Sequence, residues 1–100
     1  MKFVLDEKFV ADGTAATMSQ PQRFKIAKFL KEQGPAFVDQ IAKETDIHPR
    51  MVSHHVDVLQ DQKLVETKYE LVKINDSKRG IAVRMCWLTP RAEAMMEATK

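Results

Sequence analysis

The spacing of hydrophobic residues changes once along the chain, and the two kinds of spacing predict two kinds of structure. In residues 20–33 and 38–45, apolar residues recur three and four positions apart, as on one face of a helix. Residues 49–60 continue this spacing. Residues 65–74 and 81–88 are instead rich in β-branched and aromatic residues and flank a polar turn, which predicts a β-hairpin.

Prolines and a glycine mark where the helices begin and end. Pro21 and Pro49 suit a first helical turn, where the N–H that proline lacks would have no partner. Gly34 and Pro35 end the first helix, because glycine tolerates the backbone conformation that follows a helix and proline cannot continue it. Pro90 opens a last helix, which we expect to run to about residue 99.

The third helix, residues 49–60, has two distinct faces. At about 100° per residue, its aliphatic residues lie on one side and predict the face that packs in the core. Arg50 and His54 lie on the opposite side, with Ser53 at the flank. His55 falls at the edge of the apolar side, where we expect it to pack and to bond a backbone carbonyl.

The order of the elements is that of a winged helix-turn-helix. We predict one domain over residues 1–100, mostly α-helical with a β-hairpin wing (an α+β fold), with the helix-turn-helix at about 38–60 and the wing at about 64–88. In this fold the second helix of the helix-turn-helix enters the major groove of DNA and contacts base edges. The wing, with its turn at 75–80, reaches phosphates or the minor groove. The pattern therefore predicts a sequence-specific DNA-binding protein whose partner is double-stranded DNA.

The predicted DNA contacts lie on helix 49–60 and on the wing. Arg50 and His54 would specify sequence, since arginine is the commonest partner of guanine O6 and N7. Ser53 would help to orient the helix on the duplex. The remaining contacts are basic residues of the wing, at its tip and on its strands, which would supply salt-dependent affinity for phosphates: Lys73, Lys78, Arg79 and Arg84.

The overall composition neither demands nor forbids nucleic acid. The chain has 100 residues, 44% of them hydrophobic, and a formal net charge of +2. Basic residues outnumber acidic ones in 19–33 and in 66–84, whereas acidic residues prevail in 34–47. The core of so short a chain is thin, which favours a homodimer.

The lone cysteine and the N-terminal segment exclude several classes of protein. A single cysteine rules out an internal disulfide framework. No apolar run approaches the roughly 18 residues that a membrane-spanning helix requires. The first ten residues carry acidic side chains within their apolar stretch, unlike a signal peptide. We therefore expect a cytoplasmic protein that does not enter a membrane.

Three short segments resemble one family of regulators. Residues 20–26 (QPQRFKI) are similar to the D-P-T-R-L-R-I opening of ArsR-type winged-helix repressors, and residues 51–59 (MVSHHVDVL) to the T-V-S-x-H-L-x-x-L recognition helix of that family. Residues 64–66 (LVE) resemble its G-L-V segment before the wing. The resemblance covers about residues 16–88. It implies a homodimeric transcriptional regulator on an inverted-repeat operator, with the first and last helices as the dimer interface.

The sequence also departs from that family. Asp46 and Lys63 stand where the family usually has glycine, so each is a candidate for a positive φ angle. The metal-binding signatures of the family are missing: helix 49–60 has no cysteine pair, and the last helix has Glu93 and Glu97 but no histidine. The resemblance therefore supports DNA binding and not metal sensing, and we predict no metal and no other cofactor.

Histidine and cysteine leave some alternatives open. A metal site formed by His48, His54, His55 and Cys86 is not favoured, because adjacent helical side chains diverge by about 100° and zinc needs convergent ligands. Cys86 fits a small buried hydrophobic residue, although an exposed thiol of low pKa would suit a redox sensor.

The sequence also bears on an effector pocket, on catalysis and on protein binding. The apolar residues near the ends of the chain are expected to pack in the core or at a dimer interface, or else to line an effector pocket between subunits; they are Phe3, Phe9, Met95 and Met96. An enzyme is not expected, since the chain has no glycine-rich phosphate loop, nucleophile elbow or His-Glu metal motif. A winged-helix protein-interaction module remains an alternative, because Asp57 and Asp61 lie toward the groove-facing side. The operator, the effector and the direction of regulation stay open.

Overall fold

Helices precede a long β-ribbon, and one more helix follows it. The structure is a computed structural model that describes residues 14–73 and 80–97. Within these residues the elements, in chain order, are α2 (Thr14–Ser19), α3 (Pro21–Gln33), β1 (Ala36–Phe37), α4 (Val38–Thr45), α5 (Pro49–Asp61), β2 (Val65–Lys73), β3 (Gly80–Leu88) and α6 (Pro90–Glu97). The helices and the hairpin predicted from the sequence are all present, and their described ends agree with the prediction to within one or two residues. The predicted end of the last helix, at about residue 99, lies outside the described residues.

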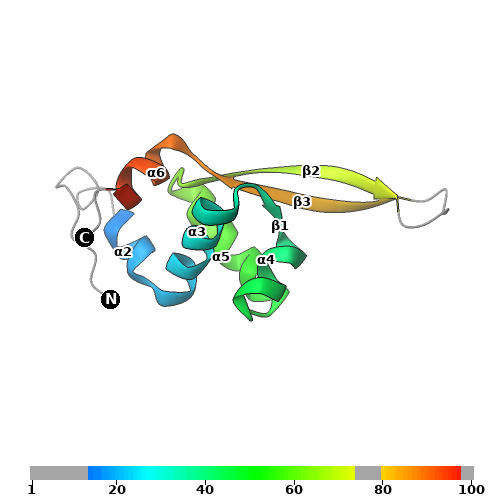
Figure 1. Cartoon of the computed structure of the whole chain (residues 1–100), viewed down its shortest axis with the longest axis horizontal. Coiled ribbons are helices and arrows are strands. Elements are labelled where there is room, and N and C mark those ends of the chain that lie inside the picture. Colours follow the sequence, from blue (N-terminus) through cyan, green and yellow to red (C-terminus); the bar gives the residue numbers. More distant parts are fainter. Residues whose placement is uncertain (1–13, 74–79, 98–100) are drawn as a thin grey trace.

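Strands β2 and β3 form the wing, and a third strand joins them at its base. The two long strands pair antiparallel, from Val65 opposite Leu88 to Lys73 opposite Gly80. Strand β1 adds to the free edge of β3, which gives the order β1-β3-β2. The ribbon projects beyond the helices (Figure 1). The winged helix-turn-helix fold is thereby confirmed, whereas β1 was not predicted, because two residues carry no periodicity.

One hydrophobic core joins the helices to the base of the ribbon. It contains the apolar faces of α3, α4 and α5 together with side chains of β3 and α6, among them Ile26, Ile41, Leu59, Cys86 and Met95. Full burial of one large aliphatic side chain contributes about 1.5–3 kcal/mol. The core therefore fixes which face of α5 points away from the body.

The ends of the helices follow local chemistry. Gln20 caps α3, because its side-chain Oε1 accepts a hydrogen bond from the backbone N–H of Arg23 at 2.8 Å. Gly34 ends that helix at a φ of 81°. Asp46 and Lys63 adopt φ angles of 57° and 60°, as their glycine-like positions suggested.

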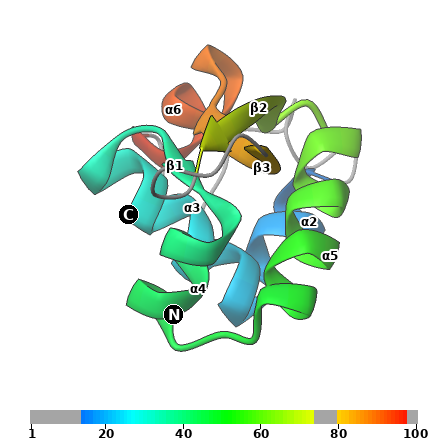
Figure 2. The same ribbon diagram turned by 90° about the vertical axis from the view of Figure 1, so that its right-hand side faces the viewer.

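The tight turn between α4 and α5 sets the angle of α5. Asp46 ends α4 in the left-handed conformation, and its backbone N–H donates to the carbonyl of Ala42. Ile47 then enters the core, and Pro49 starts α5. Figure 2 shows α5 along one side of the body, with α4 connected to it by this turn. Among the described residues, none of the helices has the length and apolar character needed to cross a bilayer.

Candidate nucleic-acid interface

Helix α5 presents a polar face away from the core. Arg50 and His54 are exposed, and Ser53 is half-buried at the flank. The opposite face, which includes Val52 and Val56, is fully buried. The division predicted from helical spacing is therefore the division seen in the structure.

The first turn of α5 is capped by a histidine ring. His48 occupies the N-cap position, and its Nδ1 accepts a hydrogen bond from the backbone N–H of Arg50 at 3.1 Å. This bond satisfies one of the N–H groups that have no partner within the helix. From the sequence, His48 is considered only as a metal ligand, and this role is missed. The signal for it was the position of His48 directly before a proline at the first helical residue.

His55 is buried beneath the polar face and bonds a side chain of another helix. Its Nε2 lies 2.8 Å from Oε1 of Gln22 on α3, so the partner is a side-chain amide and not the backbone carbonyl that we expected. Burial, followed by the charge of Arg23 and the neighbouring ring of His54, lowers the pKa of His55 below its ordinary value. The neutral ring therefore ties α5 to α3.

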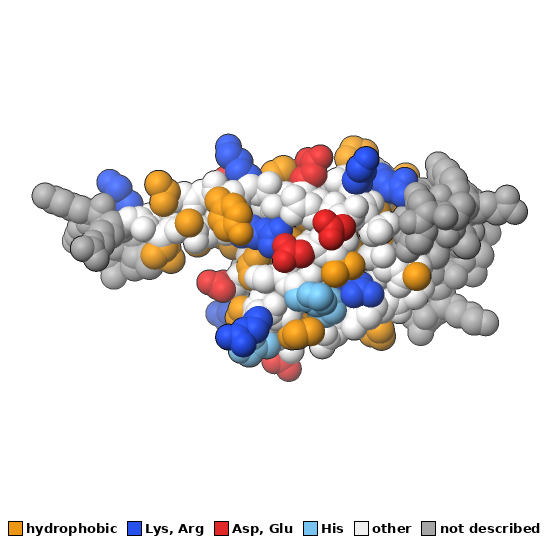
Figure 3. Space-filling model, turned by 180° about the vertical axis from the view of Figure 1, so that it is seen from behind, with side chains coloured by type: hydrophobic (Ala, Val, Ile, Leu, Met, Phe, Trp, Pro, Cys, Tyr) orange, Lys and Arg blue, Asp and Glu red, His pale blue; other side chains and the backbone are white. Residues whose placement is uncertain are grey.

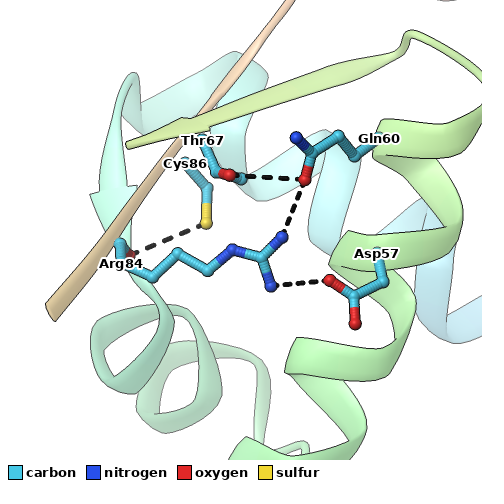
Figure 4. A network of polar contacts seen from close by, with 5 residues as sticks. All are labelled: Asp57, Gln60, Thr67, Arg84 and Cys86. Atoms are coloured by element: carbon cyan, nitrogen blue, oxygen red, sulfur yellow. Dashed lines mark hydrogen bonds and ion pairs between the residues drawn. The ribbon is translucent and has the colours of Figure 1, made fainter. Parts of the chain in front are cut away.

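Arg84 links the base of the ribbon to α5. Its Nη1 lies 2.8 Å from Oδ1 of Asp57, and its Nη2 donates to Oε1 of Gln60 at 2.8 Å. The same Gln60 oxygen accepts a bond from the hydroxyl of Thr67 on β2 at 3.3 Å (Figure 4). The aromatic ring of Tyr69 lies 6.0 Å from the guanidinium carbon. The sequence predicts that Arg84 contacts DNA, whereas in the structure Asp57 and Gln60 hold its guanidinium group.

The outer part of the ribbon carries both charge and exposed apolar surface. Lys73 is exposed at the end of β2. The side chains of Tyr69 and Leu71 are also exposed, by 67% and 80%. Figure 3 shows hydrophobic side chains along the ribbon, and acidic and basic groups side by side where the ribbon meets the helices. The two tip residues predicted to contact DNA, Lys78 and Arg79, lie outside the described residues.

A shallow hollow of about 230 Å³ separates α5 from the ribbon. Its lining includes Ser53 of α5, Asp39 of α4, and Tyr69, Ala82 and Arg84 of the ribbon. Ser53 therefore faces the ribbon side of α5. The hollow is open to solvent, and Ser53 is the residue of α5 that lines it.

Cys86 lies in the core at the foot of the ribbon. The side chain is fully buried, and burial raises the pKa of the thiol to about 11. Such a thiol stays protonated at neutral pH and behaves as a small hydrophobic residue. Within the described residues, no group of three or more histidine, cysteine, aspartate or glutamate side chains is arranged to hold a metal ion.

The structure shows where two of the four residues considered for an effector pocket lie, Met95 and Met96. Met95 is fully buried in the core, and Met96 packs against it from the edge. Phe3 and Phe9, the other residues considered for an effector pocket, lie outside the described residues.

Comparisons with known proteins agree with this geometry. A family described as a helix-turn-helix domain matches residues 18–68. A transcriptional regulator homologue from Pyrococcus horikoshii OT3 is 26% identical, with a TM-score of 0.65 over 93% of this chain and 84% of that one. A MepR-like protein, solved with pseudoligands, is 26% identical, with a TM-score of 0.64 over 91% of this chain and 62% of that one.

A more distant structure shows the same fold. BpsR of Bordetella bronchiseptica, described for the regulation of its DNA binding by 6-hydroxynicotinic acid, is 18% identical. Its TM-score is 0.61 over 90% of this chain and 71% of that chain. The chain thus spans less than two thirds of the MepR-like protein but most of the Pyrococcus homologue. A search of curated proteins gave no significant match.

Proposed function

The chain belongs to a family of helix-turn-helix domains, and from this premise we propose that it is a transcriptional regulator that binds duplex DNA through α5. One observation carries the proposal: α5 exposes Arg50 and His54 while its other face is locked in the core. A helix held in this way can enter the major groove without losing its packing.

We assign different roles to the helix and to the wing. Arg50 and His54 contact base edges, and Ser53 orients the helix from its flank. Lys73, together with Lys78 and Arg79, binds phosphates and supplies affinity that falls as salt rises. Arg84 is left out of this set, because its guanidinium is held by Asp57 and Gln60.

We further propose a homodimer that represses transcription from an inverted-repeat operator, as the resemblance to ArsR-type repressors implies. Helices α2 and α6 lie at the end of the molecule opposite the outer end of strands β2 and β3 (Figure 1), where a partner would leave both wings free. A two-fold axis there would place the two α5 helices in successive major grooves, about 34 Å apart. The proposal needs no metal or other cofactor and no catalytic step, and it places the protein in the cytoplasm.

A protein-interaction module is the second candidate. The exposed side chains of Tyr69 and Leu71 favour it, since apolar surface on a projecting ribbon can dock a partner protein. Asp61 adds negative charge at the far end of α5. In that case the chain would retain the winged helix without specific binding of DNA.

Binding of labelled duplex DNA distinguishes the two candidates. We expect fluorescence anisotropy to show binding to random-sequence duplex at low salt and a marked loss of affinity at higher salt. A footprint on genomic fragments should then identify a preferred site with two-fold symmetry. Absence of any binding at low salt would favour the protein-interaction module instead.

A further inference from the structure

Asp57 is an acidic residue on the outward side of α5, next to the proposed DNA contacts Arg50 and His54. It lies three positions after His54, so the two side chains neighbour each other on α5. The Asp57 side chain is 62% exposed. A free carboxylate at this position would repel the phosphates of a duplex that α5 approaches.

Arg84 approaches this carboxylate from the ribbon and not from α5. Its side chain is only 12% exposed and extends from β3 across to Asp57 on α5 (Figure 4). The second arm of the guanidinium bonds Gln60, one turn further along α5. Because Gln60 also accepts a bond from Thr67, both strands of the ribbon are tied to α5 at this point (Figure 4).

Building on the proposed DNA binding, we propose that Arg84 is a positioning residue that acts through Asp57 and Gln60. It neutralises the carboxylate on the outward face of α5, and it fixes the ribbon to α5 so that helix and wing meet one duplex as a single unit. Arginine suits this role, since its planar fork holds two oxygen acceptors at once, which the ammonium of lysine does not do in the same geometry.

A double-mutant cycle tests the proposal by the affinity of the full chain for a labelled random-sequence duplex. We expect Arg84→Gln to weaken binding about tenfold, because it leaves the Asp57 carboxylate unpaired beside the duplex, while the bond from Thr67 to Gln60 still ties β2 to α5. Asp57→Asn alone should bind as tightly as the wild type or more tightly. The double variant Arg84→Gln/Asp57→Asn, which keeps the wild-type net charge, should recover most of the loss and the wild-type dependence on salt.

A direct contact of Arg84 with phosphate predicts a different result. The double variant would then bind as weakly as Arg84→Gln, and the slope of log affinity against log salt would be shallower by about 0.9 in both. That outcome would overturn the inference and leave the proposed function intact. If the wild type itself failed to bind duplex DNA at low salt, the proposed function would fall, and this inference with it.

The exposed ion pair of α3 supplies a matched control. Lys28 and Glu32 lie 4.0 Å apart, and each is 57% exposed. Lys28→Gln and Glu32→Gln make the same changes of charge, and we expect each to stay within about twofold of the wild type, without rescue in the double variant. Circular dichroism of every variant verifies folding. Should Arg84→Gln unfold, Arg84→Lys replaces it, with a smaller loss of affinity that Asp57→Asn again relieves.

Discussion

Helix α5 and the outer half of the ribbon are both rich in apolar residues, yet only the helix buries most of them. Val52, Val56 and Leu59 have no exposed surface. Leu71, in contrast, is 80% exposed. It belongs to β2, in which Val65 is the buried residue and those beyond Thr67 are exposed. The difference lies in the neighbours: α5 packs against α3 and α4, whereas every residue of β2 from Lys68 to Lys73 is exposed. Hydrophobic residues thus stabilise the fold in one region and remain exposed to solvent in the other.

The largest change in stability should follow from truncating a buried side chain of α5. Leu59→Ala is expected to lower the free energy of unfolding by about 2–5 kcal/mol, because it leaves a cavity in the core. The same truncation in the ribbon, Leu71→Ala, should change it by no more than about 0.5 kcal/mol. Urea unfolding followed by circular dichroism measures both. Equal losses in the two variants would show that the ribbon is packed in solution.

The second effect concerns recognition by the exposed face of α5. Arg50→Ala is expected to cost about 1–3 kcal/mol on a preferred site and little on random duplex, since its proposed role is contact with base edges. Affinities measured by anisotropy on a selected site and on random duplex provide the comparison. A uniform loss on all sequences would instead place Arg50 on a phosphate.

A smaller and opposite pattern is expected for the ribbon. Lys73→Ala should weaken binding to all sequences by a similar factor and make the salt slope shallower by about 0.9, as the loss of one phosphate contact requires. A titration series in sodium chloride determines the slope. An unchanged slope would exclude Lys73 from the interface and weaken the proposed division between helix and wing.

The smallest effect is a dependence of stability on pH that arises beneath α5. The pKa of His55 is lowered in the folded chain, so the unfolded chain binds the proton more readily. We therefore expect the contribution of His55 to the free energy of unfolding to be complete at a pH above 6.5, the ordinary pKa of histidine. It should decline as the pH falls through 6.5 toward the lower pKa of the folded chain. His55→Asn should flatten this part of the profile, whereas His54→Asn on the exposed side should not. Identical profiles for the wild type and His55→Asn would contradict the assignment.

Much of the fold could be predicted from local patterns. The helices around the helix-turn-helix follow from apolar spacing and from Pro21, Gly34 and Pro49, since each of these acts on its own neighbourhood. Strand β1 could not be predicted in this way, because it exists only through its pairing with β3. The positive φ angles of Asp46 and Lys63 were anticipated only because of the resemblance to a family with glycine there.

Less of the candidate site than of the fold could be predicted from the sequence. Helical spacing separated Arg50 and His54 from the buried face of α5, because that separation depends on one element alone. The hydrogen bond from His55 to Gln22 and the ion pair of Arg84 with Asp57 join residues far apart along the chain. Their partners depend on how the helices and strands pack together, and the spacing of residues within one element carries no information about that packing.

The pairing of β1 with β3 also bears on the order in which the chain folds. Ala36 lies opposite Cys86, about fifty residues later, whereas β2 and β3 are neighbours in sequence. Closing so long a loop costs more chain entropy than closing the hairpin, so contacts of high sequence separation tend to form late. Weakening this short strand is therefore expected to accelerate unfolding more than it slows folding. The two residues of β1 would then slow unfolding by holding the wing against the helices.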